Sequence, residues 1–281
     1  MEEFILTIRC DDAPGIVLAI AQGVAEAGGN ILESDQYSDV ITGLFCIRMR
    51  FEAEQGSLES ARAMISARVS RFEPTFLLRT LSHRPRALLM VSKYDHCLFD
   101  LLYRWQRGEL PIEIPLVVSN HNDCRELVER HGIEFVHLPV SPATKAQAEA
   151  RLLELLSEHA IDFVVLARYM QVLSDDLCRV MSGRIINIHH SFLPGFKGAK
   201  PYHQAYERGV KLIGATAHYV TAELDEGPII AQDVVRVEHA HSADGLAIMG
   251  SDVERVVLSR AVRLHAEDRV ALVGSRTVVF D

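Results

Sequence analysis

Asn187 and His189 are the first residues of this sequence whose types and spacing suggest chemistry. They lie two positions apart at the end of a short apolar run, 184–188, and residues two apart on a strand point to the same side. An amide that donates a hydrogen bond and an imidazole beside it can together stabilise a developing oxyanion. The pair is therefore a candidate catalytic pair, and a hydrogen-bonded structural pair is the alternative interpretation.

A second polar group follows the next apolar run, 212–219. Within it, Thr216 and His218 also share one face of a strand. Asp225 comes a few residues later, shortly before a Gly-Pro turn. A carboxylate here can raise the basicity of a histidine or activate water as a general base, whereas most aspartates before such a turn are simply solvated. Neither polar group decides between these interpretations without the other.

Metal and cofactor chemistry is disfavoured by the motifs around these residues. The region contains His189, His190, His203 and His218, but no HExxH motif, no HxxxH helix pair and no cysteine ligands go with them. The sequence also lacks the GxxxxGK, GxGxxG and nucleophile-elbow patterns, which argues against P-loop enzymes, ordinary dehydrogenases and serine hydrolases. We therefore expect neither a metal nor a cofactor.

The elements that would position these residues alternate between strands and helices. Short runs rich in Val, Leu and Ile predict strands at 87–91, 113–118, 135–138, 162–166, 184–188, 212–219, 229–237 and 276–280, and helical spacing predicts helices at 98–105, 125–131, 146–160 and 242–265. Such alternation predicts an α/β doubly wound, mostly parallel sheet with helices on both faces. Ligands bind beyond the carboxyl ends of the strands in such a sheet, which is where Asn187 and His189 lie. Pro194, Gly195 and Gly198 then predict a loop that leaves this end open.

The N-terminal part of the chain predicts a smaller unit of a different kind. Its expected elements are strands at 4–10, 30–37, 44–51 and 74–81 and helices at 16–27 and 58–69. Their order, βαββαβ, is that of an α+β ferredoxin-like fold. A short polar and basic stretch separates this unit from the alternating pattern. We therefore predict domains at 1–81 and 87–281, joined by a linker at 82–86.

The composition limits the classes of protein that remain. The chain has 281 residues and a mass of 31.4 kDa, and its 48% of hydrophobic and 24% of charged residues exclude a disordered or fibrous chain. A net charge of -9 argues against nucleic acid and anionic membranes as partners, and no apolar run is long enough to span a membrane. The N-terminus lacks a signal-peptide pattern, and scattered cysteines without CxxC spacing predict reduced thiols. We expect a cytoplasmic enzyme.

Several motifs, taken in order, resemble the formyl transfer family that depends on 10-formyltetrahydrofolate. They are Asn187-Ile188-His189, Ser191-Phe192-Leu193-Pro194, the segment 214–219 and Leu224-Asp225-Glu226-Gly227-Pro228. The resemblance implies a catalytic triad of Asn187, His189 and Asp225. It covers nearly the whole chain, because 4–81 resembles the ACT domain that the hydrolytic, deformylase branch of this family carries.

The loop after the first strand of the larger domain separates the branches of the family. Members that formylate a ribonucleotide have a loop rich in Gly, Ser and Asn, whose backbone amides hold the phosphate. Here the stretch 92–98 has no glycine, and Asp95 would repel a phosphate. This stretch and the segment 201–206 resemble the deformylase pattern instead. The resemblance therefore implies hydrolysis of 10-formyltetrahydrofolate to formate and tetrahydrofolate, which balances one-carbon pools and supplies formate for purine synthesis.

The resemblance also implies roles for further residues. Folate would bind between the loops 167–173 and 221–225. The implied contact residues are Met170, Gln171, Leu173, His218 and Thr221. Either Asp225 or His189 would act as the general base. In the ACT domain the implied ligand residues are Asp12, Gly15 and Asn30, with an amino acid as the regulator or, alternatively, with assembly into a homo-oligomer as the only role.

Two alternatives stay open. A transferase would deliver the formyl group to an amine rather than to water, and the triad alone does not separate transfer from hydrolysis. A non-catalytic sensor of folate or amino acids would bind without reacting, although a pure binding protein does not need the full triad.

Overall fold

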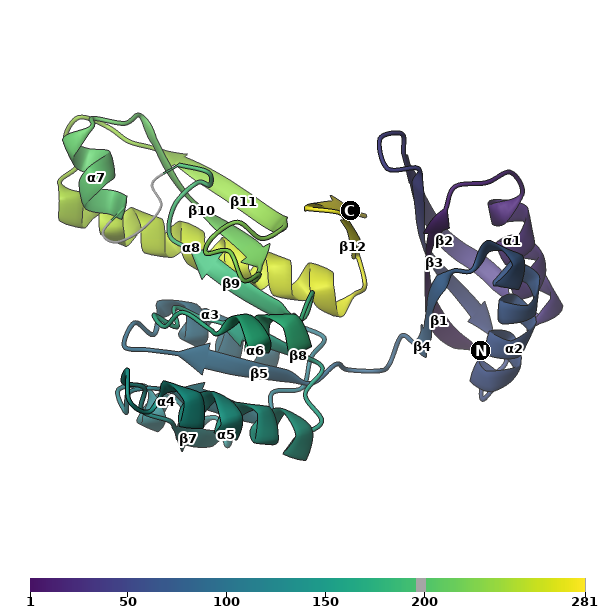
Figure 1. Ribbon diagram of the computed structural model, residues 1–281, viewed down its shortest axis with the longest axis horizontal. Helices are drawn as coiled ribbons and strands as arrows, with labels where there is room; N and C mark the ends of the chain where they lie inside the picture. Colours follow the sequence, from purple (N-terminus) through teal and green to yellow (C-terminus); the bar gives the residue numbers. More distant parts are fainter. Residues whose placement is uncertain (196–200, 281) are drawn as a thin grey trace. The chain divides into compact units, whose positions relative to one another are not determined.

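The computed structural model describes residues 1–195 and 201–280, and for Pro201 the backbone only (Figure 1). The chain divides into two compact units, one made of Met1–His83 with Asp268–Asp281 and the other of Arg84–Glu267. The loop predicted at Gly198 lies outside the described residues.

The first unit has the predicted βαββαβ order. Its elements are β1 (Glu2–Asp11), α1 (Ile16–Glu26), β2 (Asn30–Asp39), β3 (Leu44–Ala53), α2 (Leu58–Val69), a 3-10 turn η1 (Ser70–Phe72) and β4 (Thr75–Thr80). The strands form an antiparallel sheet in the order β2-β3-β1-β4, which is the ferredoxin-like arrangement. Alternate side chains of β1 and β3 face α1 and α2, and the rings of Phe4 and Phe51 stack 5.3 Å apart in this core.

A C-terminal hairpin completes the first unit. It consists of β12 (Val270–Val273) and β13 (Arg276–Val279), and it packs Val273 and Phe280 against Cys46 of β3. Arg276 pairs with the buried Asp39 at 3.0 Å. The sequence analysis assigned these residues to the second domain, because a short strand carries no local sign of which sheet it will pack against.

The second unit contains a seven-stranded sheet in the order β11-β10-β9-β8-β5-β6-β7 (Figure 1). Its elements are β5 (Ala87–Val91), α3 (His96–Gln106), β6 (Leu116–Ser119), α4 (Arg125–Arg130), β7 (Glu134–His137), α5 (Lys145–Glu158), β8 (Phe163–Leu166), α6 (Asp175–Val180), β9 (Ile185–His189), α7 (Pro201–Glu207), β10 (Leu212–Tyr219), β11 (Ile229–Arg236) and α8 (Ala243–Ala266). The strands β5 to β9 pair in parallel, and β10 and β11 are antiparallel. The predicted mostly parallel sheet is confirmed, and α6 and α7 are helices that the sequence analysis missed.

Helices cover the sheet of the second unit because its central strands are apolar on both sides. Every residue of β5 is buried. Leu88 and Met90 pack on α5 and α6, while α8 lies along β9, β10 and β11 and contacts α3 (Figure 1). This packing fixes the carboxyl ends of β8 and β9 at one edge, where parallel sheets place their ligands.

The sequence analysis expected reduced cysteines and no membrane-spanning segment. All five cysteines are free thiols, and all are buried. Among the described residues, no helix combines the length and the apolar character that crossing a membrane requires.

Candidate active site

A single cavity of about 260 Å³ opens where β8, β9 and β10 end, between the loops that follow β8 and β10. All eight predicted catalytic and substrate-binding residues line it: Met170, Gln171, Leu173, Asn187, His189, His218, Thr221 and Asp225. Segments far apart in the chain therefore meet around one space, as the proposed triad requires. The sequence analysis did not assign a role to Arg168 and His190, which also line this cavity.

Asn187 is oriented by His218, its direct partner on the neighbouring strand. His218 Nδ1 lies 2.9 Å from the Tyr219 carbonyl oxygen, which only accepts, so Nδ1 carries a hydrogen. Burial lowers the pKa of His218, which keeps the ring neutral near pH 7 and leaves Nε2 as an acceptor. Asn187 Nδ2 therefore donates to His218 Nε2 across 3.2 Å. This bond fixes the amide so that its second N–H remains available to a ligand.

His189 and Asp225 form the second pair of the site. His189 Nδ1 lies 3.2 Å from Asp225 Oδ1, and both side chains are about nine-tenths buried or more. Burial raises the pKa of Asp225, but the hydrogen bond from His189 and the nearby imidazoles outweigh it and hold the pKa below its ordinary value. His189 Nε2 is buried, has no hydrogen-bond partner and belongs to a cavity-lining residue. Such an atom is available to a reacting group.

The turn that carries Asp225 depends on a glycine. Asp225 has a left-handed backbone with φ 57°, and Tyr219 N donates to the Pro228 carbonyl at 2.9 Å. A Cβ on Gly227 would lie 1.7 Å from the Tyr219 carbonyl oxygen, so only glycine allows the turn to press against β10. A register shift between β10 and β11 after Ala217 bends the ladder beside the site.

Thr216 has a structural role in this site. It is fully buried, and its hydroxyl donates to the Ser191 carbonyl at 2.9 Å and accepts from Leu193 N at 3.0 Å and from Gln232 Nε2 at 2.9 Å. Thr216 therefore ties the loop after β9 to β10, which holds the end of β9 in place.

The loop after β8 is held by Ser92, at the end of β5. Ser92 Oγ accepts from Met170 N at 2.9 Å and donates to Asn120 at 2.7 Å. Met170 is half exposed, whereas Leu173 is buried and belongs to the apolar core of the second unit. Leu173 therefore also packs in the core, whereas Met170 does not.

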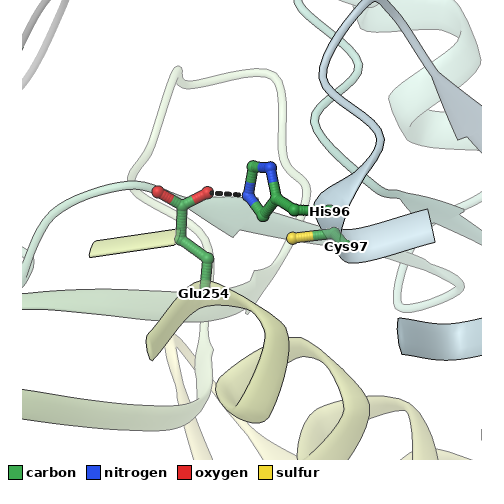
Figure 2. A group of neighbouring side chains, drawn as sticks. All are labelled: His96, Cys97 and Glu254. Carbon is green, nitrogen blue, oxygen red and sulfur yellow. Dashed lines mark hydrogen bonds and ion pairs between the residues drawn. The ribbon is translucent and has the colours of Figure 1, made fainter. Parts of the chain in front are cut away.

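A buried polar cluster lies next to the cavity and joins α3 to α8 (Figure 2). Glu254 Oε2 accepts from His96 Nε2 at 2.8 Å, and Glu254 Oε1 accepts from Tyr202 at 2.6 Å. Cys97 completes a group whose potential metal-ligating atoms lie within 4.8 Å of one another, and the sequence analysis did not identify this group. The Arg168 guanidinium, 3.4 Å from Glu254, opposes a cation at this place.

The three predicted regulatory residues do not come together within the chain. Asp12 and Gly15 lie between β1 and α1, and Gly15 has a left-handed φ of 90° at the start of the helix. Asn30 starts β2 and pairs with Glu52, which itself pairs with Glu3 near the far end of β1. Asn30 is therefore nearly the length of a strand away from Asp12, so the three residues do not form one site within the first unit.

Comparison with known proteins agrees with this geometry. Residues 85–262 match the family model described as "Formyl transferase". A protein of Corynebacterium sp. (strain P-1) named "Formyltetrahydrofolate deformylase" is 50% identical over 278 residues, which is 98% of this chain and 97% of that protein. The crystal structure of a formyltetrahydrofolate deformylase from Pseudomonas syringae has a TM-score of 0.96 at 47% identity and covers 100% of this chain and 95% of its own.

A glycinamide ribonucleotide transformylase from Symbiobacterium toebii is similar over a shorter region. Its structure has a TM-score of 0.67 at 32% identity and covers 72% of this chain and 97% of its own. The sheet and the match to the family model thus define a formyl-transferase-type domain. Since the deformylases match along nearly the full length, including the first unit, the chain belongs to the formyltetrahydrofolate deformylase family.

Proposed function

We propose that this chain hydrolyses 10-formyltetrahydrofolate to formate and tetrahydrofolate. One observation carries the proposal: the unpartnered His189 Nε2 lies in the same cavity as the free N–H of Asn187 and the Asp225 carboxylate. These groups supply a proton acceptor, a donor for an oxyanion and a counter-charge, which are what attack of water on a formyl group requires. The name shared by the full-length relatives supports the same reaction.

In the proposed reaction the formyl oxygen of the folate accepts a hydrogen bond from the second N–H of Asn187. Water adds its oxygen to the formyl carbon, and its proton passes to His189 Nε2. Asp225 stabilises the resulting imidazolium through the bond at Nδ1, and the imidazolium and Asn187 stabilise the oxyanion. The imidazolium then protonates N10, the C–N bond breaks, and formate leaves with the net release of one proton. This arrangement favours His189 over Asp225 as the general base, because Asp225 already accepts from His189.

The two loops of the cavity provide the proposed folate site. Met170 and Gln171 lie on one side, and Thr221 lies on the other. Met170 N is bonded to Ser92, so the backbone of this loop is held in place before substrate arrives. We assign the pterin ring to this space, with His218 acting through Asn187 rather than on the substrate. No metal or nucleotide cofactor takes part in the proposed steps.

The first unit is proposed to be an ACT-type regulatory domain. Its βαββαβ topology fits that class, and Asp12 and Gly15 stand in the loop proposed to bind an amino-acid regulator. The edge strand β2 exposes Ile31, Leu32 and Tyr37, which supports pairing of two copies into a homo-oligomer. We further propose that the protein acts in the cytoplasm, where the formate it releases supplies purine synthesis.

The direct test is to incubate the protein with 10-formyltetrahydrofolate and to measure formate and tetrahydrofolate together. We expect the two products in equal amounts with no amine present. A transferase would release little formate until an acceptor amine was added, and a sensor would bind the folate without releasing either product. Either of these results would overturn the proposal.

A further inference from the structure

Arg168 is a buried cation that the proposed hydrolysis does not use. It lies two residues beyond the end of β8, and its side chain is only 10% exposed. Its backbone is left-handed with φ 63°, which is uncommon for a residue with a side chain and is found most often at functional sites. The residue lines the cavity that also contains Asn187, His189 and Asp225.

The guanidinium of Arg168 has donors that the protein leaves without acceptors. Its Nε and Nη1 atoms are buried, and neither has a hydrogen-bond partner. Glu254 lies 3.4 Å from Nε as an ion-pair partner, but its two oxygens already accept from His96 and Tyr202. The Tyr94 ring covers the guanidinium at 5.4 Å. Glu254 and Tyr94 thus stabilise the charge in the interior without satisfying its N–H groups, and unsatisfied buried donors are costly unless a ligand meets them.

The reaction supplies a ligand of the matching chemistry. Hydrolysis turns a neutral formamide into a carboxylate, so a new negative charge appears inside this cavity. A guanidinium donates charge-assisted N–H···O bonds to a carboxylate, and the unpartnered Nη1 of Arg168 can donate one of them. We propose that Arg168 is the binding residue for the formate product, and this inference rests on the proposed function. Arg168 would accept the anion after the C–N bond breaks.

The alternative role for Arg168 is to neutralise Glu254, which in turn binds His96 of α3 and so holds α3 against α8. The two roles make opposite predictions for Glu254. If Glu254 competes with formate for the guanidinium, its removal strengthens formate binding. If Arg168 only serves Glu254, neither residue affects formate.

The test is a titration of the full chain with ¹³C-formate, followed by the broadening of the formate NMR signal. In Arg168→Met we expect formate to bind about 10- to 100-fold more weakly, because a charge-assisted pair is lost. In Glu254→Gln we expect tighter binding than in the wild type. Arg255→Met removes a cation from an exposed position on the same helix as Glu254, and should leave formate binding unchanged. Melting temperatures confirm that each variant is folded.

Wild-type formate affinity in Arg168→Met would overturn the inference. If that variant does not fold, Arg168→Lys decides. A lysine keeps the charge but not the planar guanidinium whose Nη1 lacks an acceptor, so binding should weaken, and unchanged binding would again overturn the inference. The titration needs no turnover and so separates the two proposals. If the wild type hydrolyses the folate but formate binding does not depend on Arg168, this inference alone is contradicted. If formate binding depends on Arg168 but the wild type does not hydrolyse the folate, the proposed function alone is contradicted.

Discussion

At the scale of single residues, the site works through fixed tautomers and charges. The Tyr219 carbonyl sets which nitrogen of His218 carries a hydrogen. The other nitrogen, Nε2, is left to accept from Asn187 and so sets the direction of the amide. Asp225 does the same for His189, so that Nε2 is the nitrogen left without a partner. In the proposed mechanism, Asn187 and His189 are therefore each oriented by a neighbouring side chain.

His218→Ala should lower kcat much more than it changes KM, because it frees the Asn187 amide to rotate. Loss of an oxyanion donor costs about 100- to 1000-fold in turnover, which is the effect expected for Asn187→Ala and the upper limit for His218→Ala. His218→Gln offers an acceptor oxygen for Asn187 and should recover part of the rate. Steady-state kinetics of the three variants check this. Equal rates for His218→Gln and His218→Ala would show that His218 does not act through the amide.

The stability of the second unit should fall in acid, partly because of His190. Burial lowers the pKa of His190 from 6.5 to about 4. Between these pH values the unfolded chain binds a proton at His190 that the folded chain does not. The contribution of His190 to the free energy of unfolding is therefore complete above about pH 6.5 and declines as the pH falls toward 4. One such group contributes at most about 1.4 kcal/mol per pH unit.

Urea unfolding at several pH values measures this dependence. In His190→Gln the decline between pH 6.5 and 4 should be shallower than in the wild type. The same substitution at the exposed His203 controls for the loss of one histidine. Parallel wild-type and His190→Gln curves would contradict the argument.

At the scale of elements, the site depends on how closely a turn approaches a strand. The turn after β10 returns to it, and this return brings Asp225 to His189. Gly227→Ala would place a Cβ 1.7 Å from the Tyr219 carbonyl and force the turn away. Since a displacement of about 1 Å can cost 100-fold in rate, we expect at least a tenfold loss of kcat in a folded protein.

Gly245→Ala is the matched control for this substitution. Its Cβ would meet only Ser242 Oγ, at 3.4 Å, which is an ordinary contact. Activity and melting temperature of the two variants are compared. If Gly227→Ala keeps the wild-type rate, the position of Asp225 does not depend on the turn.

At the scale of the whole molecule, the predicted catalytic residues and the C-terminal hairpin belong to different units. All predicted catalytic residues lie within Arg84–Glu267, whereas β12 and β13 pack in the first unit. A chain truncated after Glu267 should therefore lose stability in the first unit. The deletion uncovers Cys46 and removes one charged partner each from Asp39 and Arg79, namely Arg276 and Asp268.

Hydrogen exchange followed by mass spectrometry resolves the two units. Amides of β3 should exchange about tenfold faster or more in the truncated chain, because buried Val and Phe side chains each contribute about 1.5–3 kcal/mol. Amides of β9 should keep their protection. The single change Arg276→Ala, at a half-exposed ion pair, should have a much smaller effect on β3. Unchanged exchange in β3 after the truncation would contradict the assignment of the hairpin.

Much of this protein could be predicted from local patterns. The alternation of Phe4 to Cys10 and the helical spacing of Ile16 to Val24 depend only on near neighbours, and both elements are present. The placement of Asn187 and His189 on one face follows from strand periodicity in the same way. The short helices α6 and α7 were missed because a few residues carry too little periodicity.

The sequence by itself determined which side chains were available and which face of each strand they occupied, because the backbone repeats within a few residues. Only the tertiary structure decided that Asp225 meets His189, that Asn30 lies far from Asp12, and that the C-terminal hairpin packs on β3. It also left two buried donors without an acceptor on Arg168, a residue that lines the cavity. These outcomes depend on contacts between segments distant in the chain, and such contacts leave no periodic signal in the residues that make them.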